Sequence, residues 1–169
     1  MSTTNGFIGK SVKRVEDKRF INGHGNYTDD IILPNQTYAA FVRSQYAHAK
    51  ILSVDISAAN AMPGVVKIYT GADVSAVNGV PCGWQVNFKN GAAMKEPKHP
   101  LLVADKARHA GDAIAIVIAE SKAQAVDAAQ AVNVEYEELP CVVDAFRATQ
   151  PGAPLVHDDV PNNMIFDWA

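Results

Sequence analysis

The chain has 169 residues, of which 48% are hydrophobic and 20% charged, a composition typical of a soluble globular protein long enough to fold alone. The formal net charge of −3 at pH 7 argues against a nucleic-acid partner, which would normally leave a basic patch. No apolar stretch approaches the ~20 residues of a membrane-spanning helix and the N-terminus lacks signal-peptide features, so we expect a cytoplasmic protein.

The first 36 residues predict an extended arm. They are rich in Gly, Asp and Asn over residues 22–35 and show little hydrophobic periodicity. Gly23 and Gly25 are expected to form a tight turn at positive φ, with Asp29 or Asp30 accepting hydrogen bonds from nearby backbone amides. The part of the arm over residues 14–30 carries charges of both signs, glycine turns and few apolar anchors, so alone it buries too little surface to offset its ordering entropy. We therefore expect it to become ordered only against a partner.

Short runs rich in β-forming residues follow the arm. Residues 38–43 and 50–55 predict two strands, and residues 65–69 predict a third. A short helix is expected between the second and third strands, over residues 58–62, with Ser57 as its N-cap.

Residues 78–100 contain repeated glycine and proline breakers and predict a long loop or irregular hairpin. Loops of this length in compact domains tend to be functional or to form interfaces. Trp84 and Phe88 are candidate interface residues, because aromatic side chains exposed on a loop usually need a partner surface. The alternative is that the loop folds back over its own core.

A strand, a helix and a second strand are predicted after this loop. The run A-I-A-I-V-I-A over residues 113–119 is typical of a strand buried on both faces, which would place Ile116 in the core. Its alanine and valine face would let a helix approach closely. Ser121 and Gln124 form the S-x-x-Q pattern of a capping box at the start of that helix. Residues 132–137 alternate apolar and polar side chains, as a half-buried strand does. If the two strands are parallel, their crossover should be right-handed.

This uneven succession of strands and helices suits an α+β fold, with a mixed sheet and two or three helices, better than a doubly wound parallel sheet. Three segments are predicted. Residues 1–36 form the arm, residues 37–145 form the folded domain, and residues 146–169 form a proline-bearing tail, with a short helix around residues 144–149.

No residue pattern indicates a catalytic, cofactor-binding or metal site. The run G-H-G-N-Y-T lacks the third glycine of a dinucleotide fingerprint, and the five histidines form no H-x-x-x-H or H-E-x-x-H pair. There is no G-x-S-x-G nucleophile elbow. Cys82 and Cys141 form no C-x-x-C pair and are expected to be reduced structural thiols. Glutamates 135, 137 and 138 are interpreted as a solvated strand face rather than as catalytic carboxylates.

Basic and aromatic residues are candidates for an interface instead. Arg108 belongs to the segment R-H-A-G-D just before the predicted buried strand. It could pair with an acidic partner subunit, or the segment could simply turn the chain into the sheet, with Asp112 capping the turn. The candidate interface residues in the arm are Arg14, Arg19, Phe20 and Tyr27.

Three stretches of the sequence together carry a family resemblance. They are residues 9–30 (G-K-S-V-K-R-V-E-D-K-R-F-I-N-G-H-G-N-Y-T-D-D), residues 33–49 (L-P-N-Q-T-Y-A-A-F-V-R-S-Q-Y-A-H-A), and residues 81–119, with P-C-G-W, M-K-E-P-K-H-P and R-H-A-G-D-A-I-A-I-V-I-A. They resemble the molybdenum-containing large subunits of the xanthine oxidase and aldehyde oxidase family, most closely its carbon monoxide dehydrogenase large chains. The resemblance implies an α/β hammerhead domain, which is an α+β fold, for residues 37–145.

The resemblance also implies a role. Large subunits of this family hold a molybdenum ion on a pterin cofactor and oxidise their substrate with water, and companion subunits carry iron-sulfur clusters and FAD. The family's pterin-binding loops, active-site cysteine loop and catalytic glutamate have no counterpart in these residues. The chain is thus expected to be a non-catalytic part of such an oxidoreductase, inactive alone and binding no cofactor. It would scaffold the cofactor domains and dock the iron-sulfur subunit; the remaining molybdenum-binding domains and the flavin subunit are further implied partners.

Residues 146–169 would then be a linker toward the molybdenum-binding domains. We expect either a truncated domain or one piece of a split subunit. The alternative is a free-standing binding or assembly module that has lost the enzyme. A reading frame that continues past residue 169 into glycine-rich pterin loops would favour the first of these functions. The residues that would determine whether the substrate is carbon monoxide or another small molecule are not in this sequence.

Overall fold

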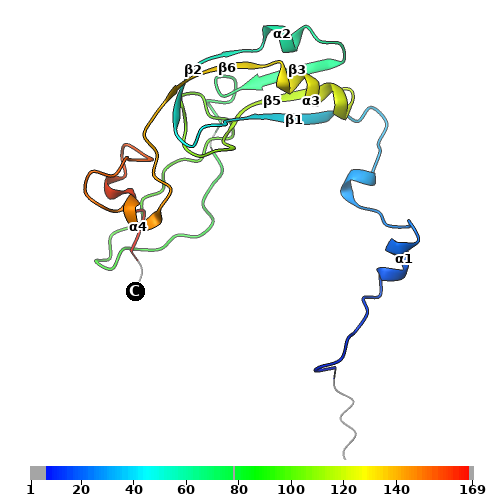
Figure 1. Cartoon of the computed structure of the whole chain (residues 1–169), viewed down its shortest axis with the longest axis horizontal. Coiled ribbons are helices and arrows are strands. Elements are labelled where there is room, and N and C mark those ends of the chain that lie inside the picture. The colour runs from blue at the N-terminus through cyan, green and yellow to red at the C-terminus, as the bar shows by residue number, and fades with distance from the viewer. Residues whose placement is uncertain (1–6, 78, 168–169) are drawn as a thin grey trace, which may run out of the picture. The chain divides into compact units, whose positions relative to one another are not determined.

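The computed structural model describes residues 7–77 and 79–167 (Figure 1). The chain divides into two units, Met1–Gln36 and Thr37–Ala169. Parts of three predicted segments lie outside the described residues: residues 1–6 of the arm, Asn78 of the long loop, and residues 168–169 of the tail.

The first unit contains two short helical segments, α1 (Asp17–Ile21) and the 3-10 helix η1 (Thr28–Asp30). Gly23 has a φ of 72° in the turn between them, and Asp30 Oδ2 accepts a hydrogen bond from Tyr27 N at 2.9 Å. The predicted turn chemistry is confirmed for these two residues, whereas Gly25 does not adopt positive φ. Residues 17–30 are therefore folded locally, contrary to the expectation of an extended chain.

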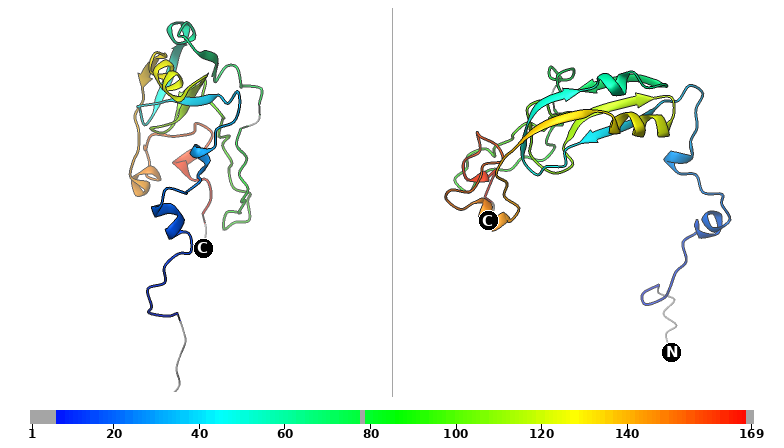
Figure 2. Two further views of the ribbon diagram at one scale, coloured as in Figure 1. Left: turned by 90° about the vertical axis from the view of Figure 1, so that its right-hand side faces the viewer. Right: turned by 45° about the horizontal axis from the view of Figure 1, so that its top comes forward.

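The second unit contains two antiparallel sheets of three strands each. In one, β5 (Ala113–Ala119) lies between β1 (Tyr38–Arg43) and β3 (Val65–Thr70). Helix α3 (Lys122–Gln130) packs against β1 and β5 of this sheet (Figure 2). One cluster of the hydrophobic core lies between this helix and the sheet, and its buried members are Ala59, Ile68, Val117, Ala128 and Val132.

In the other sheet, β2 (Ala49–Asp55) lies between β4 (Lys106–Ala107) and β6 (Asn133–Glu138). Strand β6 pairs antiparallel with β2, so the predicted strand, helix, strand unit is no parallel crossover: β5 and β6 belong to different sheets. The alternation predicted for β6 is confirmed, with Val134 and Tyr136 half-buried and the glutamates exposed.

Strand β5 is buried mainly on its alanine and valine face. Ala115, Val117 and Ala119 are fully buried, as expected for small side chains that let α3 approach closely. On the opposite face Ile114 is fully buried, but Ile116 is only half-buried. The prediction that Ile116 lies in the core is therefore wrong, whereas Ile114 shows that the second face of the strand is buried in part.

The two predicted helix starts have different outcomes. Ser121 caps α3 as expected, because its Oγ accepts from Gln124 N at 3.3 Å and lies 2.8 Å from Gln124 Oε1. Ser57 is not the N-cap of α2 (Ser57–Asn60) but its first residue. The Asp55 carboxylate takes the capping role and accepts from Ser57 N at 2.9 Å. Aspartate two positions earlier can do this because its short side chain reaches forward to free amides.

Most of the other described residues of the second unit are irregular, apart from two short helical segments near its C-terminal end. Residues 79–100 form an irregular hairpin with two isolated bridges, Val80 to His99 and Asn87 to Ala93. The predicted helix of the tail is confirmed as α4 (Ala145–Ala148), with Asp144 accepting from the backbone N of residues 146 and 147. A 3-10 helix, η2 (Pro161–Asn163), follows. Together these elements confirm the α+β prediction. No helix in the described part of the chain is long and apolar enough to cross a membrane.

Candidate functional site

Four of the predicted interface residues lie together in the first unit. The Phe20 ring stacks on Tyr27 with 5.5 Å between centroids. The Arg19 and Arg14 guanidinium carbons lie 5.2 and 6.0 Å from the Phe20 ring centroid, and Arg14 Nε also pairs with Asp17 at 2.9 Å. Cations at these distances are attracted to the face of an aromatic ring. We call these four residues, Arg14, Arg19, Phe20 and Tyr27, the arm cluster.

The arm also exposes many large apolar side chains. Ile8 is 99% exposed, Val15 is 96% exposed and Ile21 is 82% exposed. The large apolar residues exposed in the described part of the arm are Phe7, Ile8, Val12, Val15, Ile21, Tyr27, Ile31, Ile32 and Leu33. Three of them, Val15, Ile21 and Tyr27, lie within residues 14–30, for which few apolar anchors were expected. Large apolar side chains exposed within one segment make that segment a candidate interaction surface.

The long loop packs against the C-terminal segment of the same chain. The Trp84 ring meets Phe166 edge to face, with 5.7 Å between centroids. Lys95 N donates to Ile165 O at 2.9 Å, and Lys89 N donates to Asp167 Oδ1 at 2.8 Å. Trp84 remains half exposed and Phe88 is half-buried. The loop thus folds onto its own chain, although onto the tail rather than over the core, and part of the Trp84 ring is left accessible.

Arg108 interacts with its own chain. Its Nη1 donates to Lys106 O at 3.1 Å, and its Nη2 lies 3.7 Å from the Asp105 carboxylate. The buried Asp112 carboxylate accepts from Arg108 N at 3.0 Å. The capping role expected of Asp112 is therefore confirmed. Gly111 beside it has a φ of 92°, which favours glycine, and turns the chain into β5.

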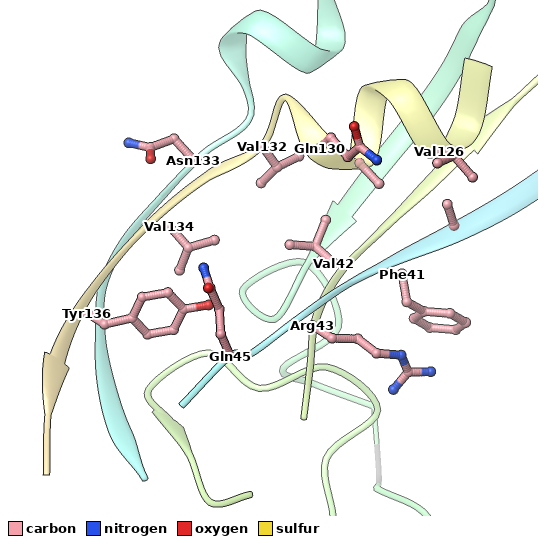
Figure 3. Close-up of a pocket in the computed structure, with 12 residues that line it drawn as sticks. Phe41, Val42, Arg43, Gln45, Val126, Gln130, Val132, Asn133, Val134 and Tyr136 are labelled. Carbon is pink, nitrogen blue, oxygen red and sulfur yellow. The ribbon is translucent and has the colours of Figure 1, made fainter. Parts of the chain in front are cut away.

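A groove that the sequence interpretation missed runs between β1, α3 and β6, with a cavity volume of about 440 Å³ (Figure 3). Phe41 and Arg43 of β1 line one side, with the guanidinium carbon 5.0 Å from the ring centroid. Tyr136 of β6 lines the other, and burial raises the pKa of its hydroxyl, which stays protonated at neutral pH. The groove joins segments about 90 positions apart in the sequence, so no local pattern could have revealed it.

The donor atoms needed for a metal centre are not gathered anywhere in residues 7–77 and 79–167. No three His, Cys, Asp or Glu side chains there lie close enough together to hold a metal ion. Cys82 and Cys141 are exposed free thiols, whereas iron-sulfur clusters are typically held by four cysteines. The described residues do not fit the metal cofactors that the resemblance implies for whole enzymes, so we assign no chemical step to them.

We expect the purified chain to contain no stoichiometric molybdenum, iron or flavin, because its described side chains offer no matching ligand set. Metal analysis together with a visible absorption spectrum checks this expectation. A bound chromophore at one equivalent per chain would contradict it.

The geometry defines a small mixed α and β domain with two three-stranded sheets. Residues 22–140 match the family model described as "Aldehyde oxidase and xanthine dehydrogenase, a/b hammerhead domain". This chain belongs to that family, which confirms the resemblance and the predicted fold.

Relatives of known identity agree with this assignment. The carbon monoxide dehydrogenase large chain of Afipia carboxidovorans is 38% identical over 93% of this chain and 18% of its own length. The nicotine 6-hydroxylase large subunit of Paenarthrobacter nicotinovorans is 38% identical over 95% of this chain and 19% of its own. The xanthine dehydrogenase molybdenum-binding subunit of Escherichia coli O157:H7 is 34% identical over 88% of this chain and 19% of its own. The chain spans less than a fifth of these relatives.

Solved structures give the same result. A Cu,Mo-CO dehydrogenase superposes with a TM-score of 0.70 at 38% identity, over 94% of this chain and 19% of that one. Quinoline 2-oxidoreductase from Pseudomonas putida 86 superposes with a TM-score of 0.74 at 38% identity, over 92% of this chain and 19% of that one.

Proposed function

We propose that this chain forms the non-catalytic hammerhead part of a molybdenum hydroxylase large subunit of the carbon monoxide dehydrogenase and xanthine dehydrogenase type. In this role it scaffolds the cofactor domains and docks the iron-sulfur subunit. The observation that carries the proposal is the set of nine large apolar side chains exposed over residues 7–36 of the arm. Their exposure in the lone chain suits a segment that is covered in an assembly.

Charge also favours docking through the arm. Residues 10–19 contain five basic and two acidic side chains, a local net charge of +3 in a chain whose net charge is −3. The arm cluster lies partly within this strip. An acidic face on the iron-sulfur subunit would complement the strip, steer the encounter and fix the register, while the apolar side chains would supply most of the affinity.

Titrating the chain with the iron-sulfur subunit tests the proposal. Val15→Ser and Ile21→Ser should each weaken binding by roughly tenfold or more, since burying such a side chain contributes about 1.5 to 3 kcal/mol. Both residues are almost fully exposed, so stability of the lone chain should not change. Ser11→Ala, at an exposed polar position in the same arm, is the matched control. Equal dissociation constants for all three variants and the unaltered chain would rule out docking through the arm.

Hydrogen exchange should detect docking of the arm in the unmutated chain. In the lone chain we expect fast exchange of arm amides outside residues 16–31, because the local backbone hydrogen bonds of residues 7–36 are concentrated in that stretch. Exchange throughout the arm should slow in a reconstituted complex. Strong protection of residues 7–15 in the lone chain would mean that the arm is already covered, and would move attention to the loop that carries Trp84.

A further inference from the structure

We propose that one face of the β1–β5–β3 sheet docks an acidic amphipathic helix of a partner domain. Helices α2 and α3 pack on the opposite face, where Ile68 and Val117 are buried. The docking face carries side chains of all three strands, because successive residues of a strand point to opposite faces. We call it the open face, and its members are Phe41, Arg43, Lys67, Tyr69, Ile116 and Ile118.

The open face has an apolar centre. Phe41 and Tyr69 are the ladder partners of Ile116 on its two sides, so the three side chains form one row across the sheet. Figure 3 shows that the side chains of Phe41 and Val42 point to opposite sides of β1. Phe41 is 46% exposed and Tyr69 is 38% exposed, and Ile116 and Ile118 are each partly exposed. The described part of the chain therefore leaves this apolar row without a complete covering layer.

The sequence of β5 is typical of a strand with a layer on each face. Antiparallel sheets that keep one face in water carry polar side chains there, whereas the run A-I-A-I-V-I-A places three isoleucines on the side of the open face. Of these only Ile114 is fully buried. The outer strands of a three-stranded sheet lie about 10 Å apart, and one helix is about 10 to 12 Å wide. A single helix is therefore enough to cover the open face, as α3 covers the other.

One cation borders the open face on each edge strand. The Arg43 guanidinium carbon lies 5.0 Å from the centroid of the Phe41 ring, and Lys67 Nζ lies 5.7 Å from the centroid of the Tyr69 ring. Neither cation forms an ion pair with a carboxylate in residues 7–77 and 79–167. A helix with carboxylates on both flanks of its apolar stripe would complement both cations.

The polar groups near the two cations leave them able to bind a partner. Arg43 Nη1 donates to Gly111 O at 2.8 Å, which uses one of its five N–H groups. The Asp73 carboxylate accepts from Thr70 N at 2.7 Å and from Thr70 Oγ1 at 2.8 Å. These hydrogen bonds lower the pKa of Asp73, and the charge of Lys67 lowers it further by a smaller amount. Asp73 thus attracts Lys67 without forming an ion pair with it.

Two other occupants fit the open face less well. Two copies packed through their open faces would bring together faces on which the only charged members are Arg43 and Lys67. Stable binding to an anionic membrane takes clusters of about four to eight basic residues, and the open face has two. The partner helix would belong to one of the cofactor domains that this chain scaffolds, so its source rests on the proposed function, whereas the open face itself does not.

The probe for the test is a blocked peptide of about five helical turns, with a leucine stripe flanked on both sides by glutamate. A staple on its polar face keeps it helical, because isolated helices of this length are marginal in water. Its binding to the full 169-residue chain is measured by fluorescence anisotropy. We expect saturable binding of this peptide and none of the same peptide with lysine in place of glutamate.

Reversing the charges of the open face should reverse this preference. The double variant Arg43→Glu with Lys67→Glu should lose the glutamate peptide and bind the lysine peptide. Lys89→Glu with Lys98→Glu, the same charge change at two exposed lysines of the loop over residues 79–100, is the control and should keep the original preference. Equal binding of the two peptides by the unaltered chain, or binding of neither, would overturn the proposal.

The apolar row is tested by Phe41→Ala, which should weaken binding of the glutamate peptide at least about tenfold. Phe146→Ala in α4, where the ring is 87% exposed, is the matched control and should leave the affinity unchanged. Thermal unfolding checks that both variants are folded. Equal affinities for the unaltered chain and both variants would contradict docking on this row.

Further measurements separate the other occupants. A dimer of the unaltered chain that Phe41→Ala abolishes would assign the open face to a second copy, and binding to phosphatidylserine vesicles without binding of the peptide would assign it to a membrane. Either result would overturn the proposal. The open-face variants should bind the iron-sulfur subunit as the unaltered chain does, so that docking through the arm and docking on the open face fail separately. Weakened binding would assign the open face to that subunit and overturn its assignment to a cofactor domain.

Discussion

Replacing Ile114 with alanine is expected to lower the free energy of unfolding by roughly 2 to 5 kcal/mol, the range seen for large-to-small changes at fully buried aliphatic residues. Ile114 is among the largest fully buried side chains of the described residues. It lies on β5, the central strand of its sheet, next to a segment anchored by a bond from Val103 N to Ala113 O at 2.7 Å. The cavity that the substitution leaves would lie on a strand with a neighbour on each side, so the surrounding structure would relax little into it. Denaturant titration measures the loss.

Ile116→Ala is the matched control, because it makes the same chemical change two residues further along the same face of β5. Ile116 is less buried than Ile114, so we expect a smaller cost than for Ile114→Ala, because less apolar area is removed from water. A larger loss for Ile116→Ala than for Ile114→Ala would contradict the burial pattern of this strand.

Replacing Gly71 with alanine should cost about 3 kcal/mol, at the upper end of the usual range for overpacking. A Cβ at Gly71 would lie 2.6 Å from Ala104 N and from the carbonyl group of Val103. Both neighbours are backbone, so they cannot turn aside as a flexible side chain would. The same segment holds Leu102 and Val103 in the core, so a shift there would disturb buried contacts as well.

Gly83→Ala is the control for this substitution. A Cβ at Gly83 meets no atom within 4 Å, and its φ is not positive. We expect a change within about 0.5 kcal/mol, as for most surface substitutions. Thermal unfolding of the two variants side by side makes the comparison. Similar midpoints for both would contradict the close approach of the two backbones at Gly71.

The sequence predicted local structure better than pairing. The strands, the capped helix α3 and the alternation of β6 follow from side-chain periodicity and from Ser121, which act within a few residues. The sheet to which a strand belongs depends on contacts across the chain. Periodicity therefore could not show that β6 joins β2 rather than β5, or that Ile116 faces partly outward.

The candidate sites likewise divide into those that local sequence could reveal and those that depend on contacts across the chain. Trp84 and the arm cluster could be singled out because their residue types stand in segments with little regular periodicity. Helix α1 was missed because five residues give no periodicity, and the Phe20 and Tyr27 stacking beside it is a contact between separate elements. The groove between β1, α3 and β6 was missed because Phe41 and Tyr136 are far apart in the sequence and line one groove only once the strands have paired.

Each sheet of the second unit ends in strands whose outer edges pair with no further strand in the described part of the chain. The unpaired backbone groups of such edges can pair with a strand of another molecule, so an isolated hammerhead domain is prone to self-association. Strand β6 carries Glu135, Glu137 and Glu138, whose like charges repel a second copy of the same edge. Strands β1 and β3 have fewer charges, with Arg43 on one and Lys67 on the other. The isolated protein should therefore aggregate slowly during storage. The contacts between copies should form through β1 and β3 rather than through the acidic edge of β6.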